Sequence, residues 1–394
     1  MRQLLRASTK VRQRSAELGD IVRGLPRILA RRVPRKPDEP LRLRFVYRDI
    51  GAPARYRVAH QVEQARLAGL AAQEMPLDGT PGLYDLTACD LLYLYRLPLA
   101  PPTLALCLTA RRHGIPIVFD SDDLVWDPRE RFYNYLDDHY SPKRVARLLW
   151  ATHRTRALMR YANAFVFATP YLVRLAAQSF SQPGYVNPNA LSSAMLSDAE
   201  IAHAERMRRP ERDDIVIGYF SGAPRVHDED LASIDRALCA ILKGHANVHL
   251  RIYGELRLLG SLAQLDATAR VERRPAVDWR ELPRQIAEVD INIAPLVDNP
   301  QRRAKSAVKY LEAALVGVPT VASRLDPYQH DITDGVTGLL AATHTDWEGC
   351  LSRLIEAGEL RRRLGEAARA DILVQHTTAA RATNFAAIIT EVAA

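Results

Sequence analysis

Short apolar runs alternate with amphipathic stretches along most of this 394-residue chain. The runs are rich in β-branched and aromatic residues and occur at 41–49, 91–95, 115–120, 163–168, 215–220, 248–253 and 291–294. Stretches with helical periodicity, such as Arg144–Tyr161 and Asp230–Leu242, lie between them. Runs of this kind are typical of central strands in a parallel sheet, because helices cover both faces of such a sheet. The pattern therefore predicts an α/β fold with two doubly wound parallel sheets.

Polar segments divide the chain into parts. Pro34–Pro40 has the composition of a linker, and Leu191–Asp213 is rich in Arg and Glu, which indicates a connection between domains. Residues 1–40 then form an N-terminal segment, and residues 41–190 and 211–375 form two Rossmann-like domains. Ligands of such sheets bind at the carboxyl ends of the strands, so we expect an active cleft between the two domains.

The stretch 304–323 predicts a helix, a tight turn at Gly317 and a buried strand. One stripe of the helix is apolar and consists of Ala304, Val308, Leu311 and Leu315. A second stripe is charged and consists of Lys305, Lys309 and Glu312. A helix that begins beside a lysine suits an anion such as a diphosphate. The alternative is a solvated helix face supported by Lys–Glu pairs.

Carboxylates crowd the end of the strand predicted at 115–120, where Asp120, Asp122 and Asp123 follow one another closely. Crowding of like charges is costly, which indicates a functional role. The carboxylates could accept hydrogen bonds from sugar hydroxyls, bind a divalent metal ion or cap the next segment.

Two glycine-containing strand ends complete the candidate chemistry. Ser221 and Gly222 follow the strand 215–220 and can offer backbone N–H groups to a phosphate, with Arg225 just beyond them. Gly51 and Arg55 follow the first strand and could approach a ligand, although the residues alone favour an ordinary strand-to-helix turn.

Charge is placed unevenly along the sequence. The net charge is +8, and residues 1–40 hold eleven Lys/Arg against four Asp/Glu, so almost the whole excess lies there. Residues 1–33 alternate basic and apolar positions, which favours an amphipathic helix on an anionic membrane surface. A disordered tail, a short coiled coil and a helix packed on the body are the alternatives. The nearly neutral remainder argues against a nucleic-acid-binding domain.

The remaining composition excludes several classes. No apolar run is long enough to span a membrane, and the four cysteines form no CxxC pair, so neither a disulfide framework nor a zinc site is indicated. We expect a cytoplasmic protein, with peripheral attachment to the inner face of the membrane as a further expectation.

Four segments together resemble the GT-B glycosyltransferases, specifically the retaining, family-4-like group of bacterial polysaccharide and glycolipid synthesis. These segments are Val118–Asp123, Ile217–Gly222, Tyr253–Gly254 and Lys305–Ser323. The resemblance implies a glycosyltransferase (EC 2.4) that moves a sugar from a nucleotide-diphosphate sugar to a glycan or lipid-linked acceptor, with retention and without a metal or other cofactor. It also implies that a final helix, 376–394, completes the N-terminal domain.

The same resemblance implies the roles of individual residues. Donor binding would fall to the second domain, through Ser221, Gly222, Tyr253, Gly254, Lys305, Ser306, Lys309 and Glu312. Lys305 and Arg225 would neutralise the leaving diphosphate, with Asp122 as a third catalytic candidate. Acceptor binding would fall to Gly51, Arg55, Asp120 and Asp123 in the first domain.

One position departs from the family pattern: the first glutamate, eight residues before the second, is Ala304 here. This departure keeps other hypotheses open. A nucleotide-sugar 2-epimerase shares the fold class, and a catalytically degenerate GT-B partner subunit would also lack that glutamate. A third alternative takes Asp120-Ser121-Asp122 as a metal-binding DxD motif.

Overall fold

The computed structural model describes residues 19, 21, 24, 30–48, 51–77, 85–129, 140–210, 212–222, 227–266 and 268–394. The chain forms two compact units. Unit 1 comprises Met1–Pro188 and Arg381–Ala394, and unit 2 comprises Asn189–Ala380. The basic segment 1–33 lies largely outside the described residues, so the amphipathic helix and its membrane contact stay predictions. Among the helices that the structure describes, none is long and apolar enough to cross a membrane.

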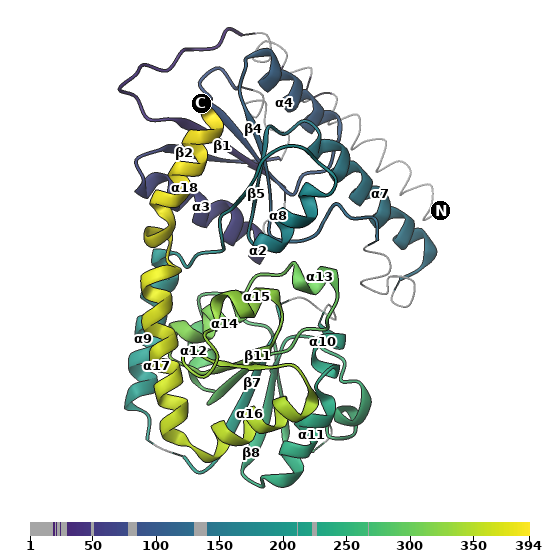
Figure 1. The fold of residues 1–394 in the computed structure, drawn as a ribbon, viewed down its shortest axis with the longest axis vertical. Helices are drawn as coiled ribbons and strands as arrows, with labels where there is room; N and C mark the ends of the chain where they lie inside the picture. Colours follow the sequence, from purple (N-terminus) through teal and green to yellow (C-terminus); the bar gives the residue numbers. More distant parts are fainter. Residues whose placement is uncertain are drawn as a thin grey trace. The chain divides into compact units, whose positions relative to one another are not determined.

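Unit 1 is built on a six-stranded parallel sheet with the order β2-β1-β3-β4-β5-β6 (Figure 1). Its strands are β1 (Arg42–Tyr47), β2 (Ala71–Pro76), β3 (Leu91–Tyr95), β4 (Ile117–Ser121), β5 (Ala164–Phe167) and β6 (Gly184–Val186). The three strands with the strongest apolar runs, β3, β4 and β5, are buried at every position. The predicted doubly wound α/β architecture of this part is confirmed.

Helices cover the sheet of unit 1. They are α2 (Ala52–Ala54), a π-helical turn (Arg55–Ala59), α3 (His60–Leu67), α4 (Pro101–Arg112), α7 (Pro142–Met159), α8 (Pro170–Ala177) and the last helix, α18 (Thr378–Ala393). The ring of Phe385 on α18 packs 6.4 Å from that of Phe45 in β1 and 6.1 Å from that of Tyr93 in β3. The end of the chain thus belongs to the core of unit 1.

Unit 2 also contains a six-stranded sheet, with the strand order β12-β11-β10-β7-β8-β9, and all of its strands are parallel. Its strands are β7 (Ile215–Phe220), β8 (Val248–Tyr253), β9 (Val271–Arg274), β10 (Ile291–Ala294), β11 (Thr320–Ser323) and β12 (Leu339–Ala341). Strands β7, β8 and β10 have the bounds that the apolar runs predict. Edge strands β9 and β12, like β2 and β6 in unit 1, are not apparent from the sequence pattern.

The helices of unit 2 differ from expectation at two places. They are α9 (Ser193–Arg208), α10 (Asp228–Ala232), α11 (Asp235–Gly244), α12 (Leu282–Ala287), α13 (Pro300–Arg303), α14 (Val308–Leu315), α15 (Asp326–Asp331), α16 (His344–Glu356) and α17 (Gly358–Gln375), with a 3-10 turn at Gly260–Gln264. Interpreting Leu191–Asp213 as a mere connection is wrong, because most of it is α9, which packs on α12 and α14. The helix predicted from Ala304 begins only at Val308.

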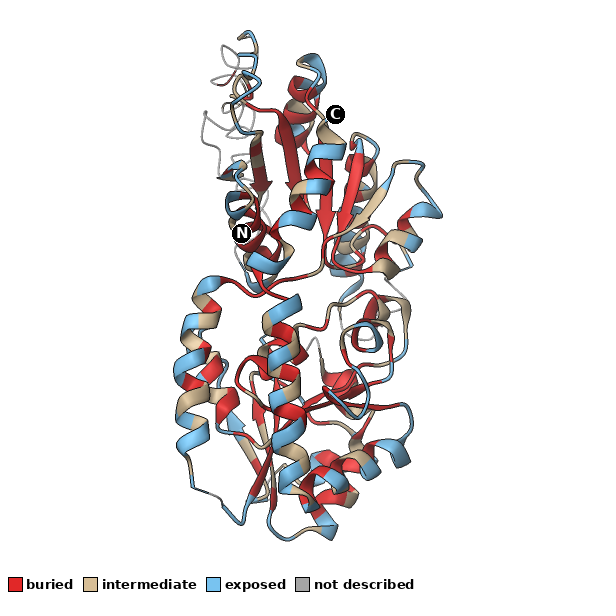
Figure 2. Ribbon diagram, turned by 60° about the vertical axis from the view of Figure 1, so that its left-hand side comes forward, coloured by how far each residue is buried: buried red, intermediate tan, exposed pale blue. Residues whose placement is uncertain are grey.

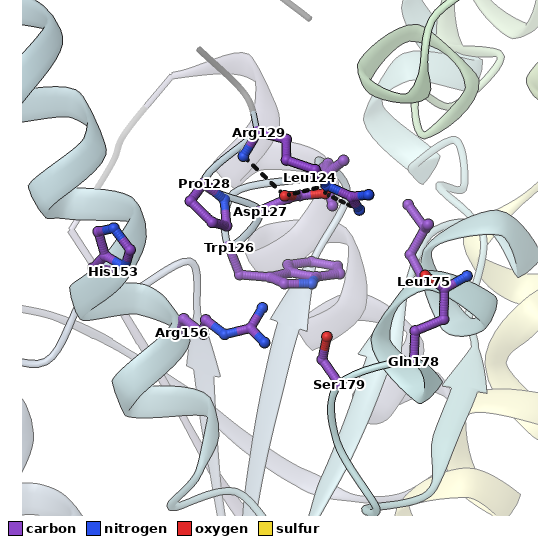
Figure 3. A pocket seen from close by; sticks show the side chains of 10 residues that line it. All are labelled: Leu124, Trp126, Asp127, Pro128, Arg129, His153, Arg156, Leu175, Gln178 and Ser179. Atoms are coloured by element: carbon purple, nitrogen blue, oxygen red, sulfur yellow. Dashed lines mark hydrogen bonds and ion pairs between the residues drawn. The ribbon is translucent and has the colours of Figure 1, made fainter. Parts of the chain in front are cut away.

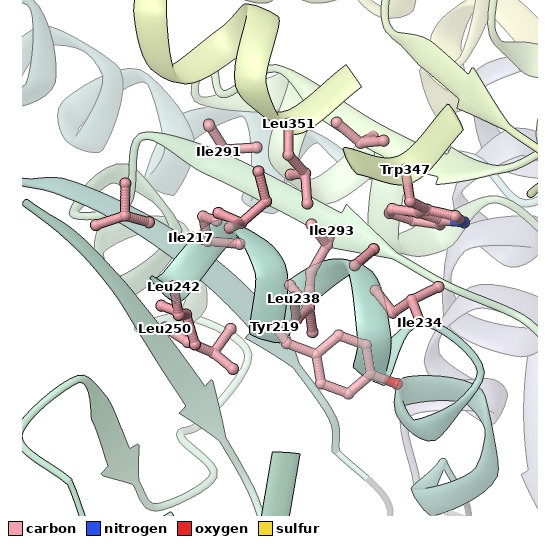
Figure 4. Close-up of a cluster of buried hydrophobic side chains, with 14 of the residues drawn as sticks. Ile217, Tyr219, Ile234, Leu238, Leu242, Leu250, Ile291, Ile293, Trp347 and Leu351 are labelled. Atoms are coloured by element: carbon pink, nitrogen blue, oxygen red, sulfur yellow. The ribbon is translucent and has the colours of Figure 1, made fainter. Parts of the chain in front are cut away.

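Each unit has its own apolar core. Figure 2 shows strands that are almost wholly buried and helices that keep exposed outer faces. In unit 2, Ile217 and Ile293 of the sheet pack with Leu238 of α11 and with Trp347 and Leu351 of α16 (Figure 4). These cores fix the strands in place, and the polar residues at the strand ends are positioned as a result.

Candidate active site

The carboxyl ends of β7 and β8 lie side by side in unit 2. The backbone N–H of Ser221 donates to the carbonyl of Tyr253 at 3.0 Å, and the rings of Phe220 and Tyr253 stack with centroids 4.5 Å apart. Gly254 has φ +96, and a Cβ at this position would lie 2.0 Å from the carbonyl oxygen of Ser221. Only glycine fits there. The structure therefore joins two segments that the sequence suggested separately, Ser221–Gly222 and Tyr253–Gly254.

Lys309 on α14 reaches the same strand end. Its Nζ donates to the carbonyl oxygen of Phe220 and lies 4.8 Å from the centre of the Tyr219 ring. The residue as a whole is half-buried, but its ammonium group is enclosed, and this burial lowers the pKa of Lys309 to about 8 in spite of the nearby charges of Glu312 and Asp230. Lys309 is therefore no solvated surface lysine. Its charge is held directly behind the Ser221–Gly222 turn.

Lys305 lies in the turn before α14 and not on the helix, which corrects the predicted charged stripe. The Asn299 side chain accepts a hydrogen bond from the Arg302 N–H at 2.9 Å and, with Pro300, starts the separate short helix α13. The chain leaves α13 at Ala304 and begins α14 at Val308. Ser306, in the same turn, accepts a hydrogen bond from the Asn189 side chain at 2.9 Å. Even so, the charges of Lys305 and Glu312 both act on the Lys309 ammonium.

Ala304 has no exposed surface. A side chain at this position is enclosed by protein, so this position offers a ligand no contact. The sugar-contacting role that the family assigns to a glutamate here is accordingly absent from the turn before α14.

A buried polar network, which the sequence did not reveal, supports the segment that leads into the turn before α14. Asp230 is completely buried and accepts hydrogen bonds from Arg302 Nε at 2.9 Å and from the Val297 N–H at 3.0 Å. Its other oxygen lies 2.7 Å from His227 Nδ1. Asp230 and Arg302 are 72 residues apart, so no local pattern pairs them.

The protonation states of this network follow from burial and pairing. Burial would raise the pKa of Asp230, but the hydrogen bond from His227 and the charge of Arg302 outweigh it and lower that pKa to about 2. Burial lowers the pKa of His227 to about 4, although the bond to Asp230 opposes this. At neutral pH His227 is therefore neutral and donates Nδ1–H to the carboxylate. Asp230 therefore compensates Arg302, and among the described residues Lys309 places a second positive charge close to this network.

In unit 1, Asp120 is not the acceptor-facing carboxylate that the sequence suggested. It has no exposed surface and accepts hydrogen bonds from Arg57, Gln61 and the Tyr93 hydroxyl, at 2.5–2.9 Å, 3.1 Å and 2.6 Å. Arg57 is equally buried and also donates to the carbonyl of Asn187 at 2.6 Å. A buried charge needs a partner of opposite charge. The ion pair of Arg57 and Asp120 therefore holds the π-helical turn that precedes α3 against β4.

Asp122 and Asp123 share a different arginine. Arg96 NH2 lies 2.7 Å from Asp122 and 3.3 Å from Asp123, and the Tyr95 hydroxyl donates to Asp122 at 3.1 Å. Arg96 has φ 46, a backbone conformation that is strained for a residue with a Cβ and is frequent at functional sites. Among the described residues, no group of three His, Cys, Asp or Glu could hold a metal ion.

Gly51 and Arg55 begin the helical segment after β1. Gly51 is exposed and extended, with φ −73, so this position does not require a glycine. The Arg55 guanidinium lies 5.2 Å from the centre of the Tyr56 ring. This geometry is that of a strand-to-helix turn. Arg225 lies outside the described residues.

Comparison with known proteins gives a consistent result. Residues 233–387, which include α14 and its preceding turn, match the family model described as glycosyl transferase-like. The chain has the GT-B fold, and its second half resembles glycosyltransferases. No curated protein matches it by sequence. The resemblance that the four segments suggested is thereby confirmed.

Solved structures share the fold of this chain at low identity. Anabaena HepE, in a structure with UDP, has 14% identity and a TM-score of 0.60, over 89% of this chain and 100% of that one. A glycosyltransferase from Rickettsia africae has 11% identity and a TM-score of 0.62, over 90% and 98%. A Listeria monocytogenes protein assigned as a UDP-N-acetylglucosamine 2-epimerase has 11% identity and a TM-score of 0.50, over 89% and 96%.

Proposed function

We propose that this glycosyltransferase takes a sugar from a nucleotide-diphosphate sugar and transfers it to a glycan or lipid-linked acceptor with retention of anomeric configuration. One observation carries the proposal: the buried ammonium of Lys309 is fixed at the end of β7, behind Ser221 and Gly222, where Lys305 and Glu312 act on it. HepE, which has the same fold, has been solved with UDP and with UDP-glucose. UDP is therefore the first nucleotide to test.

The chemistry asked of these residues is mainly electrostatic. As the bond between the anomeric carbon and the diphosphate breaks, negative charge grows on the leaving oxygen. Lys305 and Lys309 stabilise that charge in a site where solvent screens it poorly. The acceptor hydroxyl forms the new bond on the same face of the sugar, and its proton passes to the departing diphosphate. No metal ion is needed in this scheme.

The other predicted residues take supporting roles in the proposal. The turn at Ser221 and Gly222 lines the phosphates, and the Gly222 N–H donates to them, because the Ser221 N–H already donates to the carbonyl of Tyr253. The Glu312 carboxylate accepts hydrogen bonds from the ribose. Unit 1 supplies acceptor binding through Asp122 and Asp123, whose charge Arg96 partly compensates. Tyr253 and Gly254 flank the base.

Titration calorimetry with UDP, GDP and ADP tests the donor site. At least one nucleotide should bind, and Lys305→Ala and Glu312→Gln should each weaken it by roughly ten- to a hundredfold, the cost of losing a hydrogen bond to a charged group. Lys243→Ala and Glu348→Gln, which alter exposed residues of unit 2, are matched controls and should bind normally. Failure of all three nucleotides to bind the folded protein contradicts the proposal.

A nucleotide-sugar 2-epimerase is the second candidate, because the Listeria protein assigned to that activity shares the fold. An epimerase converts its donor without an acceptor. Incubation with UDP-N-acetylglucosamine alone, followed by chromatographic separation of the epimers, distinguishes the two functions. Formation of the 2-epimer in the absence of any acceptor would favour this alternative.

A further inference from the structure

Unit 1 contains a pocket that none of the predicted site residues lines. It lies between α7, the end of α8 and the segment that follows β4 (Figure 3), and its volume is about 360 Å³. This is at the lower end of the range for small-molecule sites, roughly 300–1,000 Å³. Trp126 forms one wall of the pocket. The Trp126 ring also stacks on the ring of Phe167, with the two centroids 4.9 Å apart. The pocket is therefore built on rigid aromatic packing.

Among the described residues of the pocket, one positive charge has no carboxylate partner. Asp127 and Arg129 form an ion pair with each other, with an N–O distance of 2.7 Å. Arg156 enters the pocket from α7 below Trp126 (Figure 3), and its guanidinium lies 5.3 Å from the centre of the Phe180 ring. Within the part of the chain that the structure describes, Arg156 has no ion-pair or hydrogen-bond partner. Its planar donors remain available to an anion.

Neutral hydrogen-bonding groups stand across from Arg156. Gln178 and Ser179 follow α8 and contribute an amide and a hydroxyl to the lining. A guanidinium binds a carboxylate or a phosphate through two parallel hydrogen bonds, and amide and hydroxyl groups suit the hydroxyls of a sugar ring. The combination fits a small ligand that is both hydroxylated and acidic.

We propose that this pocket binds an acidic sugar unit, carrying a carboxylate or a phosphate, of the acceptor glycan. The inference rests on the proposed transferase function, because only then does an acceptor glycan exist. The lining segment begins at Leu124, immediately after Asp122 and Asp123. A sugar held in the pocket therefore orders the segment that carries the proposed acceptor carboxylates. The unit in the pocket is distinct from the one that reacts.

Ligand-observed NMR with saturation transfer, on the full chain at low salt, tests this inference. The probes are methyl glucuronide, glucose 6-phosphate and methyl glucoside. At least one acidic probe should bind more tightly than the neutral one. Arg156→Gln should weaken that binding by roughly ten- to a hundredfold. Arg147→Gln, which removes an equal charge from an exposed position of the same helix, should leave it unchanged.

The outcomes separate the possible ligands and the two proposals. Tighter binding of the glucuronide identifies a uronic acid, and tighter binding of the phosphate identifies a phosphorylated sugar. Equal binding of acidic and neutral probes, no binding of any probe, or binding that survives Arg156→Gln overturns the inference. Ser179→Ala serves as a milder second variant should Arg156→Gln fold poorly. UDP binding, measured on the same samples, reports on the donor site of unit 2 independently.

Discussion

The pKa of Lys309 lies close to neutral pH, so its charge can be titrated in an ordinary binding experiment. Burial lowers the pKa of its ammonium from 10.5 to about 8. A difference of about 2.5 units corresponds to about 3 kcal/mol, which is the order of the cost of holding this charge in the free protein. A bound diphosphate supplies the missing negative charge. Its arrival should therefore return the pKa of Lys309 toward its ordinary value.

Donor affinity should accordingly fall above pH 8. A group with a pKa of 8 is about one-tenth deprotonated at pH 7 and about nine-tenths deprotonated at pH 9, so binding should weaken about tenfold between these values. The phosphate ionises near pH 6, so the charge of the diphosphate is nearly constant in this window. At pH 9 each UDP bound should take up close to one proton.

Stability of the free protein should move in the opposite direction. The folded pKa of Lys309 lies below that of the unfolded chain, so the unfolded chain binds more protons between pH 8 and 10.5. The contribution of this group to stability therefore rises with pH through that window. A fall in affinity without a fall in stability separates titration of Lys309 from general unfolding.

Calorimetry in buffers of different ionisation enthalpy measures both the affinity and the proton uptake. Lys309→Met keeps much of the side-chain length without the charge, and should bind UDP weakly and equally at pH 7 and pH 9. A wild-type affinity that is flat from pH 7 to pH 9 would refute the reasoning. A wild-type pH slope that persists in Lys309→Met would show that another group is responsible.

Three further predictions concern unit 1. Asp120→Asn leaves the buried Arg57 without its counter-charge and should destabilise the protein by about 3–5 kcal/mol in urea unfolding, whereas a loss below about 1 kcal/mol would show that the pair is dispensable. Phe385→Ala opens a cavity between α18 and the sheet and should cost about 3–5 kcal/mol of stability by the same measurement. A much smaller loss would show that the last helix contributes little to the core. Glycosyl transfer should be unaffected by excess chelator, since Arg96 already pairs with Asp122, and a loss of activity that Mg²⁺ or Mn²⁺ restores would favour the DxD alternative.

The strands that the sequence identifies and those that it misses differ in their place in the sheets. Central strands such as β3, β7 and β10 carry uninterrupted apolar runs because both of their faces are buried. All four missed strands, β2, β6, β9 and β12, lie at sheet edges. Strands β2, β6 and β9 are partly exposed, and β12 has only three residues. None of the four therefore has an apolar run that the sequence pattern could identify.

The charged turn before α14 shows, for single residues, what the sequence could predict and what it could not. The spacing of Lys305, Lys309 and Glu312 was apparent from the sequence, and their charges do interact. The placing of Lys305 on a helix was wrong, because the Asn299 cap starts α13 upstream and α14 restarts at Val308. Local spacing specifies which residues come near one another but not where a helix begins when a capping residue intervenes.

The sequence by itself determined the class of the protein, its parallel sheets and the segments that carry donor chemistry, because these depend on local periodicity and on motifs a few residues long. Only the tertiary structure decided which charged side chains form ion pairs inside the protein. Asp120 is neutralised by Arg57 across 63 residues and Asp230 by Arg302 across 72, whereas Lys309 is enclosed and donates to the carbonyl of Phe220. Such pairings depend on how distant strand ends and helices meet, and a buried charge is stable only where they bring a partner to it.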